Sequence, residues 1–191
     1  MKLLEPNSLI IVGASTGGPN HIREVLSSLS HNHQSTIIIA QHMGSEYIPI
    51  FAKRLQNFTP FDVVVAEDKE ILEARKIYIM SNLCTIVSKY NQLQFSILYE
   101  KNIRYNPEIN PLLLSCQNLD LPILAIILTG IGDDGADGIK ALCNKKNTTC
   151  LAESEESAIV YGMPMRARDV SQKVKVQSLE EIIQTINSFG V

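Results

Sequence analysis

LIIVGASTGG, at residues 9–18, joins a short run of Leu and β-branched residues to a turn with three glycines in its last six positions. Apolar residues then recur at helical spacing from Ile22 to Leu29. A buried strand, a glycine-rich turn and a helix in this order are typical of the first unit of an α/β sheet. We therefore predict a strand over residues 9–12 and a helix over residues 21–29.

The rest of the chain repeats this alternation of short apolar runs and segments with helical spacing. Residues 84–89 and 94–98 interrupt it and predict a β-hairpin around a turn at Tyr90-Asn91-Gln92. Because parallel strands are joined by right-handed crossovers, the pattern predicts a doubly wound, mostly parallel α/β sheet with helices on both faces and a small β-hairpin insertion. The further predicted strands are residues 36–40, 61–66, 76–80, 123–128 and 148–152, and the further predicted helices are residues 47–55, 110–116, 136–143 and 179–186.

Length and composition predict one domain over residues 1–191. The chain is 45% hydrophobic and 19% charged, and no linker, repeat or low-complexity tract divides it. A chain of this length buries roughly 70% of its unfolded surface, so its core needs no disulfide or metal. Its 17 basic and 20 acidic side chains give a net charge of −3. This balance argues against a nucleic-acid partner, because binding to phosphates needs a clustered excess of Lys and Arg.

The cysteines and the N-terminal segment predict a cytoplasmic protein. Cys84, Cys116, Cys143 and Cys150 form no C-x-x-C pair and have no histidine at metal-ligand spacing, so we expect free thiols in a reducing compartment. The apolar run at residues 9–12 is too short for a signal peptide or a membrane span. We therefore expect neither secretion nor insertion into a membrane.

Three of the predicted strands are followed by loops whose residues suit hydrolysis. Ser15 follows the first strand, His42 follows the strand at 36–40, and Asp134 follows the strand at 123–128. The carboxyl ends of parallel strands open onto one edge of the sheet, so we expect the three side chains to converge. A hydroxyl nucleophile, an imidazole base and a carboxylate that orients the base are the groups of a serine hydrolase.

The glycine-rich turn and its serine also have non-catalytic explanations. Phosphate binding is typical of such turns, but Pro19 stands where a P-loop requires Lys, and Ser15 stands where a dinucleotide fingerprint requires its second Gly. Ser15 or Thr16 could also cap the helix that follows. Capping alone does not explain three glycines, which indicate a close approach by another part of the chain or by a ligand.

The histidines and the aspartates have non-catalytic explanations as well. His42 could donate to a backbone carbonyl at the strand end, and Asp133 or Asp134 could cap the helix predicted at 136–143. A calcium loop is disfavoured, because Gly135 and Asn144 occupy ligand positions, so we expect no metal. The remaining histidines are poorer bases: His21 lies one turn into the first predicted helix, and His31 and His33 lie in a polar connection where we expect solvent exposure.

With these loops in order, the chain resembles the catalytic domain of the CheB family, the protein-glutamate methylesterases of bacterial chemotaxis. The matching stretches are residues 11–18, 41–43, 66–68, 127–135 and 161–164, which read IVGASTGG, QHM, AED, ILTGIGDDG and YGMP. The resemblance implies a triad of Ser15, His42 and Asp134 that hydrolyses glutamate methyl esters on the cytoplasmic helices of chemoreceptors. It also implies oxyanion contacts near Thr16 and Ile131, and deamidation of receptor glutamines in some members.

The resemblance carries further expectations about partners. It implies that the partners are methylated chemoreceptor cytoplasmic domains, within signal transduction, and that no cofactor is used. Family members carry an N-terminal receiver domain, whereas this chain begins about a dozen residues before Ser15, so we expect no receiver domain in cis.

Residues 80–83 and 105–108 depart from the family pattern in the walls of the expected cleft. The alternative to an enzyme is a non-catalytic receptor- or phosphate-binding module of the same fold.

Overall fold

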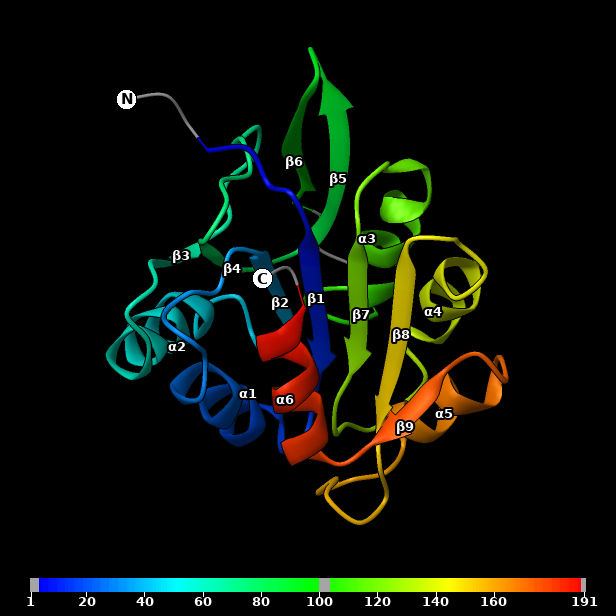
Figure 1. The fold of residues 1–191 in the computed structure, drawn as a ribbon. Helices are drawn as coiled ribbons and strands as arrows, with labels where there is room; N and C mark the ends of the chain where they lie inside the picture. Colours follow the sequence, from blue (N-terminus) through cyan, green and yellow to red (C-terminus); the bar gives the residue numbers. More distant parts are fainter. Residues whose placement is uncertain (1–3, 100–103, 190–191) are drawn as a thin grey trace.

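The computed structural model describes residues 4–99 and 104–189, which form a seven-stranded sheet and a separate two-stranded hairpin (Figure 1). The strand order is β3-β4-β2-β1-β7-β8-β9, and each neighbouring pair is parallel. This confirms the predicted doubly wound α/β sheet. The strands are β1 (Leu9–Ala14), β2 (Thr36–Gln41), β3 (Val63–Val65), β4 (Ile77–Ile79), β7 (Ile123–Ile127), β8 (Thr148–Glu153) and β9 (Lys175–Gln177).

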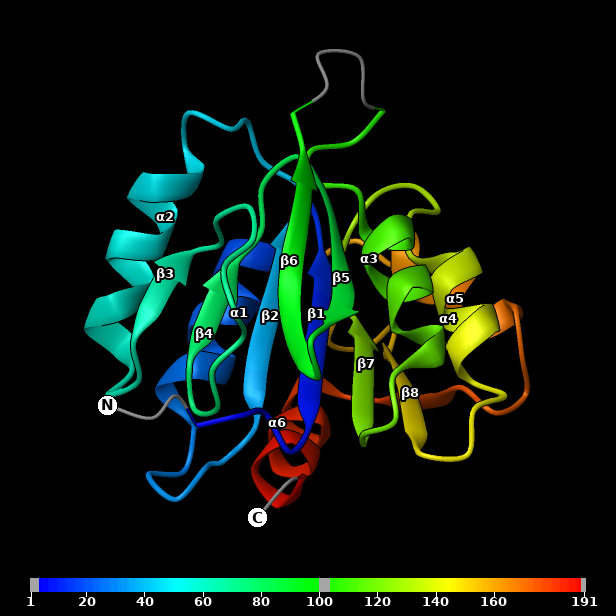
Figure 2. The ribbon, with the colours of Figure 1, turned by 90° about the horizontal axis from the view of Figure 1, so that it is seen from above.

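Helices cover both faces of the sheet (Figure 1, Figure 2). One face packs against α1 (Gly18–Ser27), α2 (Ile48–Leu55) and α6 (Leu179–Ser188). The other packs against α3 (Ile109–Ser115), α4 (Ala136–Leu142), α5 (Met163–Asp169) and the hairpin. Two short 3₁₀ segments, Gln56–Phe58 and Cys116–Asn118, follow α2 and α3.

The central strands belong to both cores. Successive side chains of a strand point to opposite faces, so Leu9 and Ile11 pack with one set of helices, whereas Ile10 and Val12 pack with the other. All residues of β1, β2 and β7 are buried. Continuous runs of Ile, Leu and Val suit strands that are covered on both faces, which is why these strands were predictable from the sequence.

The hairpin consists of β5 (Leu83–Lys89) and β6 (Gln92–Leu98), paired antiparallel. Lys89 pairs with Gln92, so the turn contains only Tyr90 and Asn91, and the prediction that Gln92 belongs to the turn is wrong. Tyr90 and Asn91 both have positive φ, 51° and 59°, as the two central residues of a tight two-residue hairpin turn require.

Other differences from the prediction occur where elements are short. The first helix begins at Gly18 and not at residue 21, because Pro19 suits the first turn of a helix. Neither α5 nor β9 was predicted. Helix α5 has seven residues, too few to show a repeated apolar stripe, and β9 is a three-residue edge strand with two exposed side chains. In the described ranges, 4–99 and 104–189, no helix is long and apolar enough to cross a membrane.

Candidate active site

The strands that precede the three candidate residues are neighbours in the sheet, in the order β2-β1-β7. Ser15 immediately follows β1 and His42 immediately follows β2. Asp134 lies in the loop between β7 and α4. All three strands are parallel, so their carboxyl ends meet at one edge of the sheet, as the sequence predicted.

Close packing explains the glycines around Ser15. Gly17 has φ 85°, in the left-handed region, and a Cβ there would lie 2.7 Å from Ile159 Cβ. A Cβ at Gly130, in the neighbouring loop, would lie 2.8 Å from Ser15 Cβ. Gly17 therefore lets the β8–α5 loop approach the β1–α1 loop closely, and Gly130 does the same for the β7–α4 loop, which fulfils the expectation of a close approach by another part of the chain.

The backbone of the Ser15 loop is held by the protein itself. The Ser15 N–H donates to Thr129 O at 3.0 Å, and Ser15 O accepts from the Gly18 N–H and from Gln41 Nε2, each at 2.9 Å. The Ser15 and Gly18 N–H groups are therefore not free to bind a phosphate, which disfavours the phosphate-binding alternative.

The helix-capping alternative for Ser15 and Thr16 is wrong. The N-cap residue of α1 is Gly17, and in the described part of the chain no side chain caps this helix. Neither hydroxyl is therefore used by α1, and the Ser15 hydroxyl is available for chemistry.

His42 and Asp134 form a short hydrogen bond. His42 Nε2 donates to Asp134 Oδ2 at 2.8 Å, and the two side chains are 10% and 3% exposed. The alternative in which His42 donates to a backbone carbonyl is therefore wrong. With its hydrogen on Nε2, the neutral imidazole carries a lone pair on Nδ1, so Nδ1 is the nitrogen that can accept a proton.

The N-terminus of α3 also binds the Asp134 carboxylate. Its Oδ2 also accepts from the Ile109 N–H at 2.8 Å, and Oδ1 accepts from the Asn110 N–H at 2.9 Å. These are the first two residues of α3, whose unpaired N–H groups favour a carboxylate. Asp134 therefore does cap a helix, but it caps α3 and not α4. The N-cap residue of α4 is Gly135, so the alternative that Asp133 or Asp134 caps α4 is wrong.

Ser15 and His42 line the same surface hollow of about 410 Å³. Its other lining residues are Met43, Gly44, Arg104, Tyr105, Asn106 and Ile131. Among the described residues, Ser15 Oγ has no hydrogen-bond partner. Such contacts are often long before substrate binds, and the shared hollow leaves Ser15 and His42 open to the same ligand.

The two expected oxyanion residues also lie at this edge. Ile131 lines the hollow and is 61% exposed. Within residues 4–99 and 104–189, neither the Thr16 N–H nor the Ile131 N–H has an acceptor, so both remain available as donors. The Ser15–Thr16 peptide is fixed through Ser15 O, and because a trans peptide directs its N–H opposite to its C=O, the orientation of the Thr16 N–H is fixed as well.

Sequence reasoning missed Tyr105 and the role of Gln41. Tyr105 stacks on the His42 ring, with centroids 4.7 Å apart and planes 4° apart, and the Arg104 guanidinium lies 4.9 Å from the centroid of the Tyr105 ring. The side chain of Gln41 bridges the carbonyl oxygens of Ser15 and His42. The departure of residues 105–108 from the family pattern was the available signal for Tyr105, and the QHM stretch was the signal for Gln41.

The other histidines lie away from the hollow. His31 is exposed, as expected, but the predicted exposure of His33 is wrong, because His33 is 1% exposed and packs edge-on against Phe61. The prediction failed because the neighbours of His33 in the sequence are polar, whereas the residues that cover its ring, such as Phe61, are apolar and distant in the sequence. His21 is buried beside Glu153.

All four cysteines are among the described residues, and all are free and buried. Burial raises the pKa of Cys116 and of Cys150 to about 12 and also raises the pKa of Cys84. These thiols are therefore protonated and unsuited to nucleophilic catalysis. Within the described ranges, no cluster of His, Cys, Asp or Glu could hold a metal ion.

Comparison with known proteins relates the chain to one family and to relatives named as methylesterases. The CheB methylesterase family matches residues 10–186. The chain is 31% identical over 182 residues to protein-glutamate methylesterase/protein-glutamine glutaminase 3 of Geobacter sulfurreducens, a match that covers 93% of this chain and 49% of that protein. It is 31% identical over 190 residues to the protein-glutamate methylesterase/protein-glutamine glutaminase of Halobacterium salinarum, covering 94% of this chain and 53% of that one. The chain thus spans about half the length of the curated relatives it matches.

A solved structure has the same fold. The crystal structure of the Thermotoga maritima CheB methylesterase catalytic domain superposes with a TM-score of 0.86 at 24% identity, and the match covers 94% of this chain and 97% of that one. The family match begins at the second residue of β1 and ends in α6, so it includes the three loops at the edge of the sheet. The chain therefore belongs to the CheB methylesterase family.

Proposed function

We propose that this chain hydrolyses glutamate methyl esters on the cytoplasmic helices of bacterial chemoreceptors and releases methanol. The observation that carries the proposal is the hydrogen bond between His42 and the buried Asp134, which caps α3, together with the hollow that His42 lines with Ser15. Membership of the family and the names of the relatives support this substrate. The buried free thiols support a reducing compartment, and we therefore assign the reaction to the cytoplasm.

In the first half of the reaction, Ser15 Oγ attacks the ester carbonyl carbon while His42 Nδ1 takes the hydroxyl proton. Asp134 keeps the hydrogen on His42 Nε2 and stabilises the imidazolium that forms. The N–H groups of Thr16 and Ile131 donate to the oxyanion, a contact that contributes about 10²–10³ in rate per donor. The intermediate then collapses, the C–O bond to the methoxy group breaks, and His42 gives its proton to the leaving methanol.

In the second half, water attacks the glutamyl ester of Ser15. His42 Nδ1 takes a proton from the water, and after collapse it returns the proton to Ser15 Oγ, which leaves a glutamate side chain on the substrate. A glutamine side chain would follow the same course with ammonia as the leaving group. The second half of the relatives' names, protein-glutamine glutaminase, supports this as an additional reaction.

The form of the hollow supports a protein substrate. The hollow is lined by residues at the surface, among them the 61% exposed Ile131, and it is not an enclosed cavity. A small-molecule esterase would surround its substrate with apolar walls, whereas a side chain presented on a receptor helix needs an accessible groove.

Methanol release from a methylated chemoreceptor cytoplasmic fragment tests the proposal. We expect Ser15→Ala to abolish release and to leave the circular dichroism spectrum unchanged, because no hydrogen bond of the described residues depends on the Ser15 hydroxyl. Ser27→Ala, on the exposed end of α1, is the matched control and should retain full activity. Release by Ser15→Ala at the rate of the unaltered chain would contradict the assignment of the nucleophile.

Asp134→Asn tests the role of the carboxylate separately. An asparagine has a single acceptor oxygen, so it cannot accept from both Ile109 and Asn110, and it lacks the negative charge that stabilises the imidazolium of His42. We expect kcat to fall by about 10³- to 10⁴-fold. Asp133→Asn, at an exposed neighbour, is the control.

A further inference from the structure

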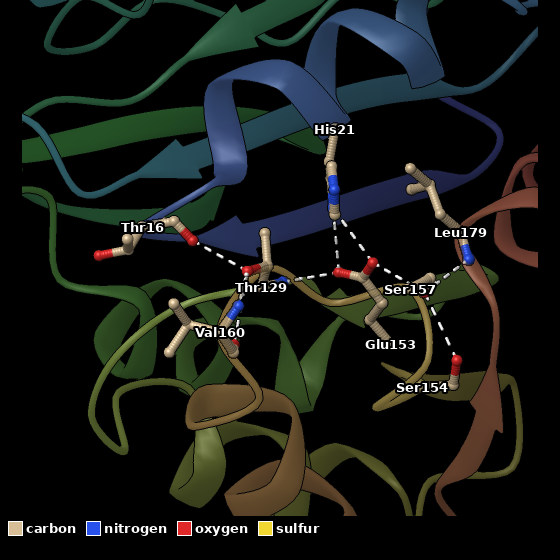
Figure 3. Close-up of polar contacts among 8 residues, drawn as sticks. All are labelled: Thr16, His21, Thr129, Glu153, Ser154, Ser157, Val160 and Leu179. Atoms are coloured by element: carbon tan, nitrogen blue, oxygen red, sulfur yellow. Dashed lines mark hydrogen bonds and ion pairs between the residues drawn. The ribbon is translucent and has the colours of Figure 1, made fainter.

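A carboxylate lies fully buried at the end of β8, two hydrogen bonds from Ser15. Glu153 is 0% exposed, and its Oε2 accepts from the Thr129 N–H at 2.7 Å. Its Oε1 accepts from the Ser157 hydroxyl at 2.9 Å. His21 Nδ1 lies 3.1 Å from Oε1 and 3.2 Å from Oε2 (Figure 3). Three donors from three segments of the chain therefore converge on one buried carboxylate.

Thr129, the residue held by Glu153, contacts the backbone on both sides of the Ser15 side chain. Thr129 O accepts from the Ser15 N–H at 3.0 Å. The Thr129 hydroxyl donates to Thr16 O at 2.9 Å (Figure 3). The Val160 N–H donates to the same hydroxyl oxygen at 2.9 Å, which leaves the hydroxyl hydrogen free for Thr16. The position of Thr129 thus determines the position of the Ser15 loop.

His21 connects the same carboxylate to α1, the helix that begins three residues after Ser15. The His21 ring points from α1 toward Glu153 (Figure 3), and its side chain is 8% exposed. The pair therefore ties β8 to α1, which follows Ser15 along the chain. The contacts of the Glu153 carboxylate with Thr129 and with His21 therefore hold the Ser15 loop at both ends.

An apolar residue at position 153 would not serve the same purpose. Burying a carboxylate is unfavourable unless donors satisfy it, and an apolar side chain would avoid that penalty. It would, however, leave the buried Thr129 N–H without an acceptor. Neither Glu153 nor His21 is among the described residues that line the hollow with Ser15, so neither is placed to touch the substrate.

We propose that Glu153 and His21 are positioning residues, which hold Thr129 and α1 so that Ser15 and the Thr16 N–H keep their catalytic geometry. This role rests on the proposed hydrolysis. Displacement of a nucleophile by about 1 Å can cost on the order of 10² in rate, so the loss should appear in kcat. The hollow itself would be unchanged, so KM should stay within about twofold.

The test compares Glu153→Ala with Glu153→Gln in methanol release from a methylated chemoreceptor fragment. We expect kcat to fall by about 10- to 100-fold in Glu153→Ala. Glu153→Gln should restore kcat to within about threefold of the unaltered chain, because its Oε1 can accept from the Thr129 N–H while its Nε2 donates to His21 Nδ1. A residue with a merely structural role would lower the melting temperature without this split between kcat and KM.

Two further variants complete the design. His21→Ala, which leaves the Thr129–Glu153 contact in place, should lower kcat by about tenfold. It provides the milder variant in case Glu153→Ala does not fold. Glu156→Ala removes an exposed carboxylate from the loop that follows Glu153 and should leave kcat unchanged. Folded Glu153→Ala and His21→Ala variants with unchanged kcat would overturn the proposal.

Amide hydrogen exchange separates this proposal from the proposed function. We expect the Ser15 and Thr129 amides to exchange faster in Glu153→Ala and in His21→Ala than in the unaltered chain, with Glu156→Ala as control. Failure of the unaltered chain to release methanol would contradict the proposed hydrolysis and would leave this measurement valid. Unchanged exchange at Ser15 in both variants would overturn the positioning role whether or not the chain hydrolyses esters.

Discussion

His33 is a buried histidine whose two ring nitrogens have no hydrogen-bond partner among the described residues. Burial, with a smaller contribution from the positive charge of Arg75, lowers its pKa from 6.5 to about 4. The folded protein therefore keeps this ring neutral at a pH where the unfolded chain has already bound a proton. A single residue thus makes the stability of the whole domain sensitive to acid.

The protein should therefore lose stability as the pH falls from about 6.5 to about 4. In this interval the unfolded chain binds a proton that the folded protein does not, so the free energy of unfolding falls by about 3 kcal/mol, with no further loss from this residue below the folded pKa. Urea unfolding at pH 7 and pH 4.5 measures the difference. His33→Leu should reduce it, and His31→Leu, at an exposed histidine of the same connection, is the matched control. An equal pH dependence in His33→Leu and the unaltered chain would contradict the assignment.

The segment that leads into α3 combines two functions at the scale of an element. The first N–H groups of α3 hold Asp134, and Tyr105, just before the helix, covers the face of the His42 ring. The same segment contacts the neighbouring loops, because Asn106 O accepts from the Met43 N–H and Asn106 Oδ1 accepts from the Asn82 N–H, each at 2.7 Å. The segment thus positions His42, Asp134 and one wall of the hollow together.

The stack on His42 gives a prediction for this segment. Tyr105→Ala removes a contact of the kind that contributes about 0.5–1.5 kcal/mol, so kcat for methanol release should fall by about 2- to 10-fold. Tyr105→Phe keeps the stacked ring and loses only the 3.4 Å hydrogen bond to Asp133, so it should remain close to the unaltered chain. If Tyr105→Phe and Tyr105→Ala lost the same activity, the hydroxyl and not the stack would be the important contact.

The sequence predicts some elements and contacts of this fold and misses others. The long buried strands and the helices with a repeated apolar stripe were predictable, and the chain order of the strands then brought Ser15, His42 and Asp134 to one edge. Helix α5 and strand β9 were too short to give a periodic signal. The capping of α3 by Asp134 joins residues 24 and 25 positions apart, and the stack of Tyr105 on His42 joins separate loops, so no local pattern reports either contact.

The two cores of the molecule differ in their chemistry. All four thiols lie in the core shared by α3, α4, α5 and the hairpin, whereas the core under α1, α2 and α6 contains none among its described residues. A thiol reagent therefore reports on one face of the sheet. Because burial raises the pKa of Cys84, Cys116 and Cys150, two conditions for reaction, exposure and ionisation, are absent together in the folded protein.

We expect a disulfide-exchanging thiol reagent to label none of the four cysteines in the native protein within minutes at neutral pH, and all four in urea. The labelling rate should follow the population of the unfolded state as urea is increased. Circular dichroism of the same samples provides the comparison. Rapid labelling of any cysteine under native conditions would show that this core opens locally, contrary to its burial in the structure.

The separation of the proposed catalytic groups along the chain has a consequence for biosynthesis. His42 and Asp134 are 92 positions apart and meet only when β7 has paired with β1, which in turn is paired with β2. A nascent polypeptide on the ribosome that has not yet released β7 lacks the carboxylate that sets the tautomer of its base. We therefore expect the growing chain to remain inert toward esters until the middle of the sheet is complete, so that hydrolytic activity emerges in one late step of cotranslational folding.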